Sequence, residues 1–141
     1  MIQFELITPE KSVLSDTVDE ITAETVMGQI TILPHHVPLL TQIVPGEMII
    51  KKGGKEEYLA VTGGFLEITK EKVIVLADYA IKSEHIEQVK AEEAKQRAEK
   101  ALAEKGTERD FALAQSELRR ALTELKVVQK RRHRGVSSPH A

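Results

Sequence analysis

Hydrophobic and polar positions follow two different periods along this chain, and the change falls near residue 83. Before that point, short runs that alternate apolar and polar side chains, such as residues 3–7, are separated by glycine and proline. With no helical pattern between them, these runs predict a sandwich or flattened barrel with no parallel strands. After that point, apolar residues recur every three or four positions, which predicts helices. We therefore predict an α+β chain: an N-terminal antiparallel β-sandwich over residues 1–82, followed by a C-terminal antiparallel two-helix hairpin over residues 83–141 with a short basic, disordered tail.

Glycine and proline mark the predicted turns. Gly53 and Gly54 lie between two apolar runs and predict a tight hairpin that needs positive φ. Residues 63–64, both glycine, permit a second bend. The corner at residues 34–38 carries two prolines, each of which fixes φ and removes a backbone donor, so this segment turns the chain and cannot continue a sheet ladder. The expected strands are residues 3–7, 12–15, 20–24, 27–33, 47–51, 57–61, 65–69 and 73–76.

The two expected helices meet near Gly106. Ser83 is the expected N-cap of the first helix, and Gly106 stands where a helix C-cap belongs. Thr107 and Asp110 have the spacing of a capping box for the second helix. Because only Gly106 and its neighbours separate the helices, they must fold back as an antiparallel hairpin or open at that hinge.

The predicted face between the helices is poor in large side chains. On the first helix it is mostly alanine, and a buried methyl contributes about 0.8 kcal/mol, against about 1.5–3 kcal/mol for leucine. Alanine also allows close approach in a permanent hairpin, so the sequence leaves open both a weakly held hairpin and a permanent one. The apolar positions are Ile86, Val89, Ala94, Ala98, Ala101 and Leu102 on the first helix and Phe111, Ala114, Leu118, Ala121, Leu125 and Val128 on the second.

Charge divides at the same point as the hydrophobic period. Residues 1–82 carry 7 Lys and Arg and 12 Asp and Glu, a net charge of −5, whereas residues 83–141 carry 13 and 10, a net charge of +3. Cysteine is absent, which excludes disulfides and cysteine nucleophiles and fits a reducing compartment. No N-terminal export signal stands out, and no run approaches the ~20 apolar residues that cross a bilayer, so neither export nor a membrane span is expected.

No pattern of catalytic residues emerges from the sequence. The glycines at residues 53–54 and 63–64 lack the spacing of a phosphate-binding loop and are interpreted as turns. His35 and His36 are adjacent in a segment expected to be extended, where neighbouring side chains point in opposite directions, so they are not expected to share a metal ion. No serine or threonine stands in a nucleophile-elbow motif. We therefore predict no catalytic residue and no metal site.

The order of residues in the proline corner is more specific than its composition. Residues 28–41 are Gly-Gln-Ile-Thr-Ile-Leu-Pro-His-His-Val-Pro-Leu-Leu-Thr, followed by Pro-Gly at residues 45–46 and Thr-Gly-Gly-Phe-Leu-Glu at residues 62–67. This order resembles the epsilon subunit of bacterial F-type ATP synthases, and the resemblance extends over the apolar run at residues 73–78 and the charged helical tail. Two positions depart from it, because the family usually has glycine where this chain has Thr31 and His35.

The resemblance implies a non-catalytic rotor subunit of a proton-translocating ATP synthase, peripheral to the cytoplasmic face of the cell membrane and without a required cofactor. Its implied partners are the gamma subunit, the c-ring and the beta subunit. In that family the two helices can leave the sandwich and extend, which implies regulation of ATP hydrolysis. The implied c-ring and gamma contact falls on Met27, Gly28, Gln29, His35 and His36.

Basic side chains without an acid among them gather at the end of the second helix, at Lys126, Lys130, Arg131, Arg132 and Arg134. Such a cluster can compensate the helix macrodipole. Nucleic acid is a second partner to consider, and it makes a free-standing adaptor or nucleic-acid-binding module the alternative function, although this half of the chain offers only Phe111 as an aromatic. The resemblance favours an acidic protein surface and no nucleic acid, because epsilon helices meet an acidic loop of the beta subunit. The basic cluster is therefore expected to be inhibitory.

A nucleotide site is also implied in part. Some bacterial epsilon subunits bind ATP through an Ile/Leu-Asp-x-x-Arg-Ala motif at the start of the first helix, together with basic residues of the second. The matching positions of this chain hold Ile86, Glu87, Lys90 and Ala91, with Arg120 at one basic position of the second helix. Lysine lacks the planar fork of arginine, and Glu124 stands where ATP-binding members have another arginine and would repel phosphate. We therefore predict weak ATP binding at most.

Overall fold

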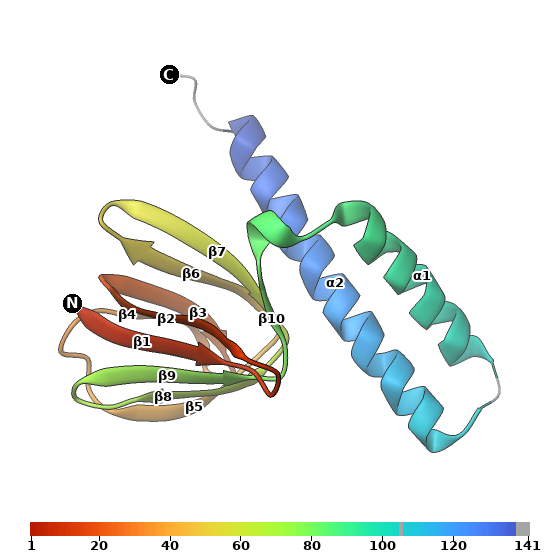
Figure 1. Cartoon of the computed structure of the whole chain (residues 1–141), viewed down its shortest axis with the longest axis horizontal. Coiled ribbons are helices and arrows are strands. Elements are labelled where there is room, and N and C mark those ends of the chain that lie inside the picture. The colour runs from red at the N-terminus through yellow and green to blue at the C-terminus, as the bar shows by residue number, and fades with distance from the viewer. Residues whose placement is uncertain (105, 138–141) are drawn as a thin grey trace. The chain divides into compact units, whose positions relative to one another are not determined.

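The computed structural model describes residues 1–104 and 106–137, so the end of the predicted disordered tail, from residue 138 on, lies outside the described residues. The chain divides into two compact units, Met1–Glu84 and the residues from His85 onward. The first unit is built of strands and the second of two long helices (Figure 1). The predicted fold class, a β-sandwich followed by two helices, is confirmed.

The strands of the first unit form one continuous sheet that folds over on itself. Their order is β10-β7-β6-β3-β5-β8-β9-β1-β2, with β4 pairing to β3. Figure 1 shows β6 and β7 on the opposite side of the sandwich from β8 and β9. The strands are β1 (Ile2–Ile7), β2 (Ser12–Val18), β3 (Glu20–Thr25), β4 (Gly28–Ile32), β5 (Leu39–Ile43), β6 (Gly46–Lys52), β7 (Lys55–Val61), β8 (Gly64–Ile68), β9 (Lys72–Ala77) and β10 (Ala80–Lys82).

The sheet passes from one layer to the other between β5 and β6, which lie one after the other along β3. Val44 and Pro45 separate them, and the Val44 N–H donates to the Glu24 carbonyl oxygen at 3.0 Å. Pro45 has no N–H to offer a ladder. A Cβ on Gly46 would overlap the Glu24 carboxylate, so a larger residue at this crossing would require the Glu24 side chain to move.

Alternating side chains build the core between the layers. Phe4 and Leu6 of β1, Leu66 of β8 and Val75 of β9 are fully buried, whereas the residues between them face outward. Each large apolar side chain buried in this way contributes about 1.5–3 kcal/mol. The turns that were predicted from glycine also form, since Lys52 pairs with Lys55 across Gly53 and Gly54, both of which have positive φ.

One pair of strands is parallel, contrary to the expectation of an all-antiparallel sheet. β1 runs alongside β9, with Gln3 paired to Lys72 and Ile7 to Leu76. The expectation rested on the absence of a βαβ unit, but parallel strands need only a long crossover connection. Here the strands from β2 to β8 serve as that connection, so the pairing had no local signal in the sequence.

The helices begin and end differently from the prediction. Ser83 is buried in a short 3-10 helix, η1 (Ser83–His85), and α1 (Gln88–Ala103) begins after Glu87, which makes no side-chain cap hydrogen bond. α1 ends at Glu104 in extended backbone, so Gly106 is not its C-cap. Because the rest of η1 and two further residues separate Ser83 from α1, Ser83 cannot be the N-cap of α1.

The predicted capping box of α2 (Glu108–Ser137) is confirmed. The Thr107 N–H donates to Asp110 Oδ2 at 3.3 Å, and the Asp110 N–H donates to Thr107 Oγ1 at 3.1 Å. α1 and α2 pack against each other, with Ala91 and Ala98 buried on the first and Ala114 and Ala121 on the second. Phe111, which we expected on the face between the helices, is instead 49% exposed.

Candidate functional site

The β3–β4 turn presents apolar side chains on a well-held backbone. The buried Thr25 hydroxyl donates to the Gly28 carbonyl oxygen at 2.7 Å and accepts from the Met27 N–H at 3.1 Å. Val26 and Met27 are nevertheless 58% and 62% exposed. Gln29 follows on β4 and is also exposed. The turn therefore combines a fixed backbone with exposed apolar surface, as a contact site requires.

The proline corner is a tight turn, as its two prolines predicted, although the backbone at His35 is not extended as we expected. Pro34 is followed by His35 at φ +68°, the left-handed conformation that the third position of a type II turn requires. Glycine or asparagine is preferred at that position of the turn, because both tolerate positive φ. His36 Nδ1 lies 2.7 Å from the Val37 carbonyl oxygen.

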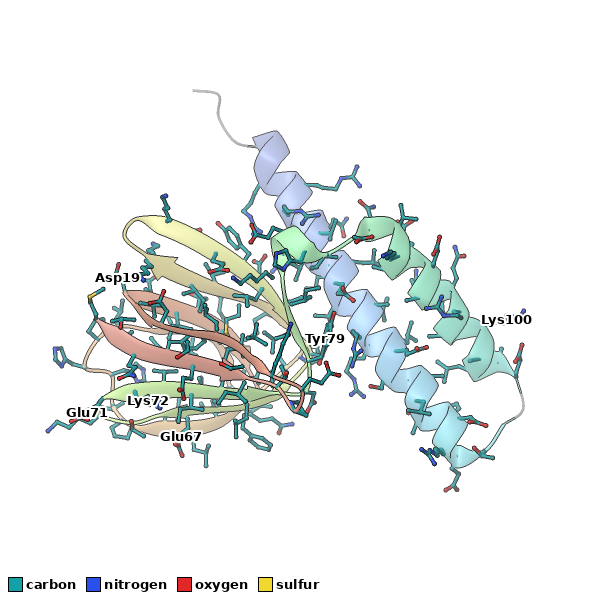
Figure 2. All side chains as sticks on the ribbon, in the orientation of Figure 1. Asp19, Glu67, Glu71, Lys72, Tyr79 and Lys100 are labelled. Atoms are coloured by element: carbon teal, nitrogen blue, oxygen red, sulfur yellow. The ribbon has the colours of Figure 1, made fainter. Side chains whose placement is uncertain are left out.

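A groove of about 260 Å³ lies beside this corner. His35 and His36 line one side of it, and Lys70, Glu71 and Lys72 line the other. Figure 2 shows Glu71 and Lys72 together at this end of the sandwich, where β8 turns into β9. Buried apolar side chains of the core, among them Ile32 and Ile68, form its floor.

β4 separates the two groups of predicted contact residues. Met27, Gly28 and Gln29 stand at its start, and His35 and His36 lie beyond its end. Five residues of strand at about 3.3 Å each span about 16 Å. The structure therefore does not bring the five residues into one patch.

An exposed apolar surface that the sequence analysis missed lies on β5, β8 and β9. Leu40, Phe65 and Leu76 are 68%, 55% and 54% exposed. Phe65 pairs with Leu76, and Leu40 pairs with Glu67, which belongs to β8 as Phe65 does. We call Leu40, Phe65 and Leu76 the outer apolar face. The sequence does carry a signal for this face, because each of the three strands has apolar residues at two adjacent positions. A strand with one face in solvent would instead alternate apolar and polar residues.

The residues that match the ATP-binding motif do not point to a common site at the start of α1. Ile86 and Ala91 are buried. Glu87 and Lys90 are exposed and pair with each other, with 3.2 Å between Lys90 Nζ and Glu87 Oε2. The Glu87 carboxylate thus neutralises the positive charge of Lys90, which a bound phosphate would need.

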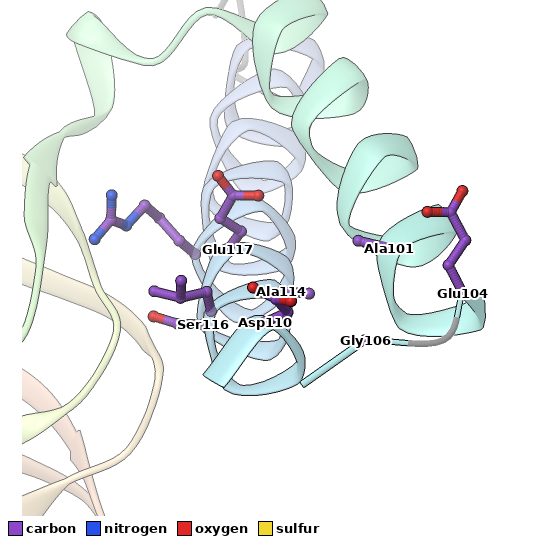
Figure 3. A pocket seen from close by; sticks show the side chains of 9 residues that line it. Ala101, Glu104, Gly106, Asp110, Ala114, Ser116 and Glu117 are labelled. Atoms are coloured by element: carbon purple, nitrogen blue, oxygen red, sulfur yellow. The ribbon is translucent and has the colours of Figure 1, made fainter. Parts of the chain in front are cut away.

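Arg120 lies on α2, beside a groove of about 620 Å³ that includes none of the four α1 motif residues. Figure 3 shows the carboxylates of Glu104, Asp110 and Glu117 around this groove. One turn after Arg120, burial raises the pKa of Glu124 above its ordinary value, and the Arg120 charge opposes that rise. The surroundings of Arg120 are therefore acidic and disfavour a polyphosphate.

The basic cluster occupies the last turns of α2. Lys126 and Arg132 are exposed, and Lys130, Arg131 and Arg134 are half-buried. Lys126, Lys130 and Arg134 recur every four residues and so share one face of the helix. Arg132 is held by a hydrogen bond from its Nη1 to Gln88 Oε1 at 3.2 Å.

Within residues 1–104 and 106–137, no three His, Cys, Asp or Glu side chains gather as a metal site would require. No helix in this part of the chain is long and apolar enough to cross a membrane.

Two family models match the chain, and they divide it as the structure does. Residues 1–83 match the beta-sandwich domain of the ATP synthase delta/epsilon chain, and residues 84–129 match its long alpha-helix domain. The chain belongs to the ATP synthase delta/epsilon family. It is 41% identical over 133 residues to the ATP synthase epsilon chain of Herpetosiphon aurantiacus, covering 94% of this chain and 98% of that one. It is 43% identical over 132 residues to the epsilon chain of Dehalococcoides mccartyi, covering 93% and 94%.

Solved structures share the fold. One is a chain of the Euglena gracilis mitochondrial ATP synthase assembly of OSCP, F1 and c-ring, with a TM-score of 0.69 and 22% identity over 94% of this chain and 81% of that one. Another belongs to the central stalk and c-ring of the Tetrahymena thermophila enzyme, with a TM-score of 0.55 and 18% identity over 88% and 96%. The resemblance to the epsilon family is confirmed. A member of this family is a component of the ATP synthase complex, so the free-standing adaptor or nucleic-acid-binding alternative is not favoured.

Proposed function

We propose that this chain is a non-catalytic central-stalk subunit of a proton-translocating F-type ATP synthase, on the cytoplasmic face of the cell membrane. The sandwich couples the c-ring to the gamma subunit, and the helices regulate ATP hydrolysis at the beta subunit. The match of both family domains, at about 40% identity to epsilon chains over nearly the whole chain, carries the proposal. The fold likeness to chains from assemblies that contain a c-ring supports it.

Two separate surfaces of the sandwich serve two partners in this proposal. The β3–β4 turn with Met27, Gly28 and Gln29 contacts the c-ring. The corner with His35 and His36 leads directly into β5, which carries Leu40 of the outer apolar face, so these contact gamma together. If a single partner contacted both groups of residues, its surface would have to extend along the whole length of β4.

Charged substitutions test the sandwich contacts in reconstituted enzyme. Gln29→Glu and Phe65→Glu place a charge on each surface without disturbing the core, so ATP-driven proton pumping should fall relative to ATP hydrolysis. Thr17→Glu, on an exposed position of β2, is the matched control. Normal proton pumping by both variants would show that these surfaces are not the contacts with the c-ring and the gamma subunit.

In this proposal the helical arm acts on the beta subunit through the charge of its basic cluster and through the length of α2. α2 has 30 residues and is about 45 Å long at 1.5 Å per residue, so an extended arm could carry the basic cluster far along a stalk to an acidic surface of the beta subunit. Each exposed ion pair contributes only about 0–1 kcal/mol, but several act together on an arm whose helices meet largely through alanine.

Truncation before Ser83 keeps all ten strands and should raise ATP hydrolysis while leaving assembly intact. Replacing Lys126, Lys130 and Arg131 by glutamine should produce part of that increase, and the difference from the natural chain should shrink at high salt. Hydrolysis rates at two ionic strengths measure both. Equal rates for all three chains would show that the arm has only a structural role.

ATP binding by this chain should be weak. The Glu87–Lys90 ion pair and the carboxylates near Arg120 both oppose a polyphosphate. Titration calorimetry on the isolated full chain should show no micromolar binding, and Glu124→Arg should strengthen binding. Micromolar affinity in the unmodified chain would contradict this interpretation.

A further inference from the structure

The Gln88 side chain hydrogen-bonds to two other side chains at the end of the hairpin away from Gly106. Its Oε1 accepts a hydrogen bond from Arg132 Nη1 on α2 at 3.2 Å, and its Nε2 donates to Glu92 Oε1 one turn along α1 at 3.3 Å. The amide is oriented correctly for both neighbours, because its carbonyl faces a cation and its NH₂ group faces a carboxylate. A neutral side chain therefore joins Arg132 to Glu92.

These three residues line a groove of about 490 Å³ between the first turn of α1 and the last turns of α2. Leu125 and Val128 of α2 line the same groove. The contact between Arg132 and Gln88 thus crosses from one helix to the other and is not a pair within one helix.

Gln88 lies far from the hinge, so its hydrogen bond to Arg132 resists opening of the helical hairpin. α1 has 16 residues, so Gln88 lies about 24 Å along the helix from its end near the hinge. Between them the helices meet through Ala91 and Ala98 on α1 and Ala114 and Ala121 on α2, which bury little apolar area each. A hydrogen bond to a charged group at the open end therefore adds to the apolar contacts that hold the helices together.

We propose that Gln88 is a positioning residue, which holds Arg132 in the closed hairpin and thereby sets how readily the arm opens. The consequence for hydrolysis rests on the proposed function, because Arg132 also belongs to the basic cluster that acts on the beta subunit. Arg132 has Gln88 as its partner when the hairpin is closed and an acidic surface when the arm is extended. Removing Gln88 and removing Arg132 should therefore have the same effect on opening and opposite effects on inhibition.

Opening is measured on the isolated full chain by thiol reactivity. The chain has no cysteine, and Ala98 is fully buried, so the thiol of an Ala98→Cys variant reacts only when the hairpin opens. In that background, Gln88→Ala and Arg132→Gln should each raise the rate of thiol modification two- to fivefold. Gln96→Ala is the matched control, because it makes the same substitution at an exposed position of the same helix and should leave the rate unchanged.

Hydrolysis in the assembled enzyme gives the second measurement. Gln88→Ala should slow ATP hydrolysis, because the arm opens more readily with all its cations, whereas Arg132→Gln should speed it. If Gln88→Ala reacted no faster than Gln96→Ala, the proposed role of Gln88 would be overturned whatever the enzyme did. A faster thiol reaction with unchanged hydrolysis would uphold the role of Gln88 in closure and overturn the proposed regulation by the arm.

Discussion

Gly64 is the position where a single methyl group should do most damage to the sandwich. It begins β8 and pairs with both Ile43 of β5 and Ala77 of β9. Its φ is +137°, and a Cβ there would overlap the Leu76 carbonyl oxygen and lie 2.8 Å from the Ala77 Cα. Gly64→Ala therefore adds a backbone strain and a backbone clash together.

Gly54 provides the matched control that separates these two effects. It also has positive φ, +79°, but a Cβ there would meet nothing within 4 Å. Positive φ costs about 1–2 kcal/mol for a residue with a Cβ, so Gly54→Ala should lower the free energy of unfolding by that amount. The clash at Gly64 adds about 1–3 kcal/mol, as overpacking does, because the β9 backbone must move. Gly64→Ala should therefore cost about 2–5 kcal/mol.

Urea unfolding followed by tyrosine fluorescence measures the difference in the sandwich alone. Tyr58 and Tyr79 both lie in the first unit, and the chain has no tryptophan. With a slope of about 1.5 kcal/mol per molar urea, the extra cost of about 1–3 kcal/mol lowers the midpoint of Gly64→Ala by at least about 0.7 M relative to Gly54→Ala. Midpoints that agree within about 0.3 M would refute the argument that β9 approaches Gly64 too closely for a side chain.

Three further changes test local features. His35→Gly relieves the left-handed strain at φ +68° but frees the unfolded chain, so the urea midpoint should rise by the equivalent of up to about 1 kcal/mol, and a lower midpoint would contradict the turn assignment. The Lys52 hydrogen bond and the Thr17 N–H hold the pKa of Asp16 below 3.8, so Asp16→Asn should destabilise the sandwich at pH 7, and this difference should disappear as the pH falls through the lowered pKa. Burial raises the pKa of Glu124 above 4.5, so the ionised carboxylate lowers the stability of the helices once the pH exceeds that raised pKa. Glu124→Gln should therefore raise the melting temperature of the helices at pH 7 and leave it unchanged at pH 4.

Features that depend on neighbouring residues were predictable from the sequence. The hairpin at Gly53 and Gly54 and the capping box of Thr107 and Asp110 both form as expected, because each is specified within four residues. The N-cap at Ser83 was wrong, because Ser83 belongs to the separate 3-10 helix η1 and α1 begins only at Gln88.

Features that depend on strand pairing could not be predicted in the same way. Leu40, Phe65 and Leu76 form one apolar face only because β5, β8 and β9 are neighbours in the sheet. The separation of Gln29 from His35 likewise depends on where β4 begins and ends, although Gln29 was correctly placed in a strand and His35 at the corner that follows it. Single-sequence patterns specify a turn but not the distance between two turns.

The parallel pairing of β1 with β9 also constrains the order in which the nascent chain can fold. β1 is the first strand of its unit to leave the ribosome, yet the strand that completes its pairing, through Gln3 with Lys72, is nearly the last of that unit. Until then β1 can pair only with β2, and Phe4 and Leu6 have no second layer to cover them. The helical arm has no such delay, because its contacts join segments that are close in sequence, and contacts of this kind form quickly. The sandwich therefore passes through an interval of incomplete burial during synthesis, in which aggregation or chaperone binding competes with folding.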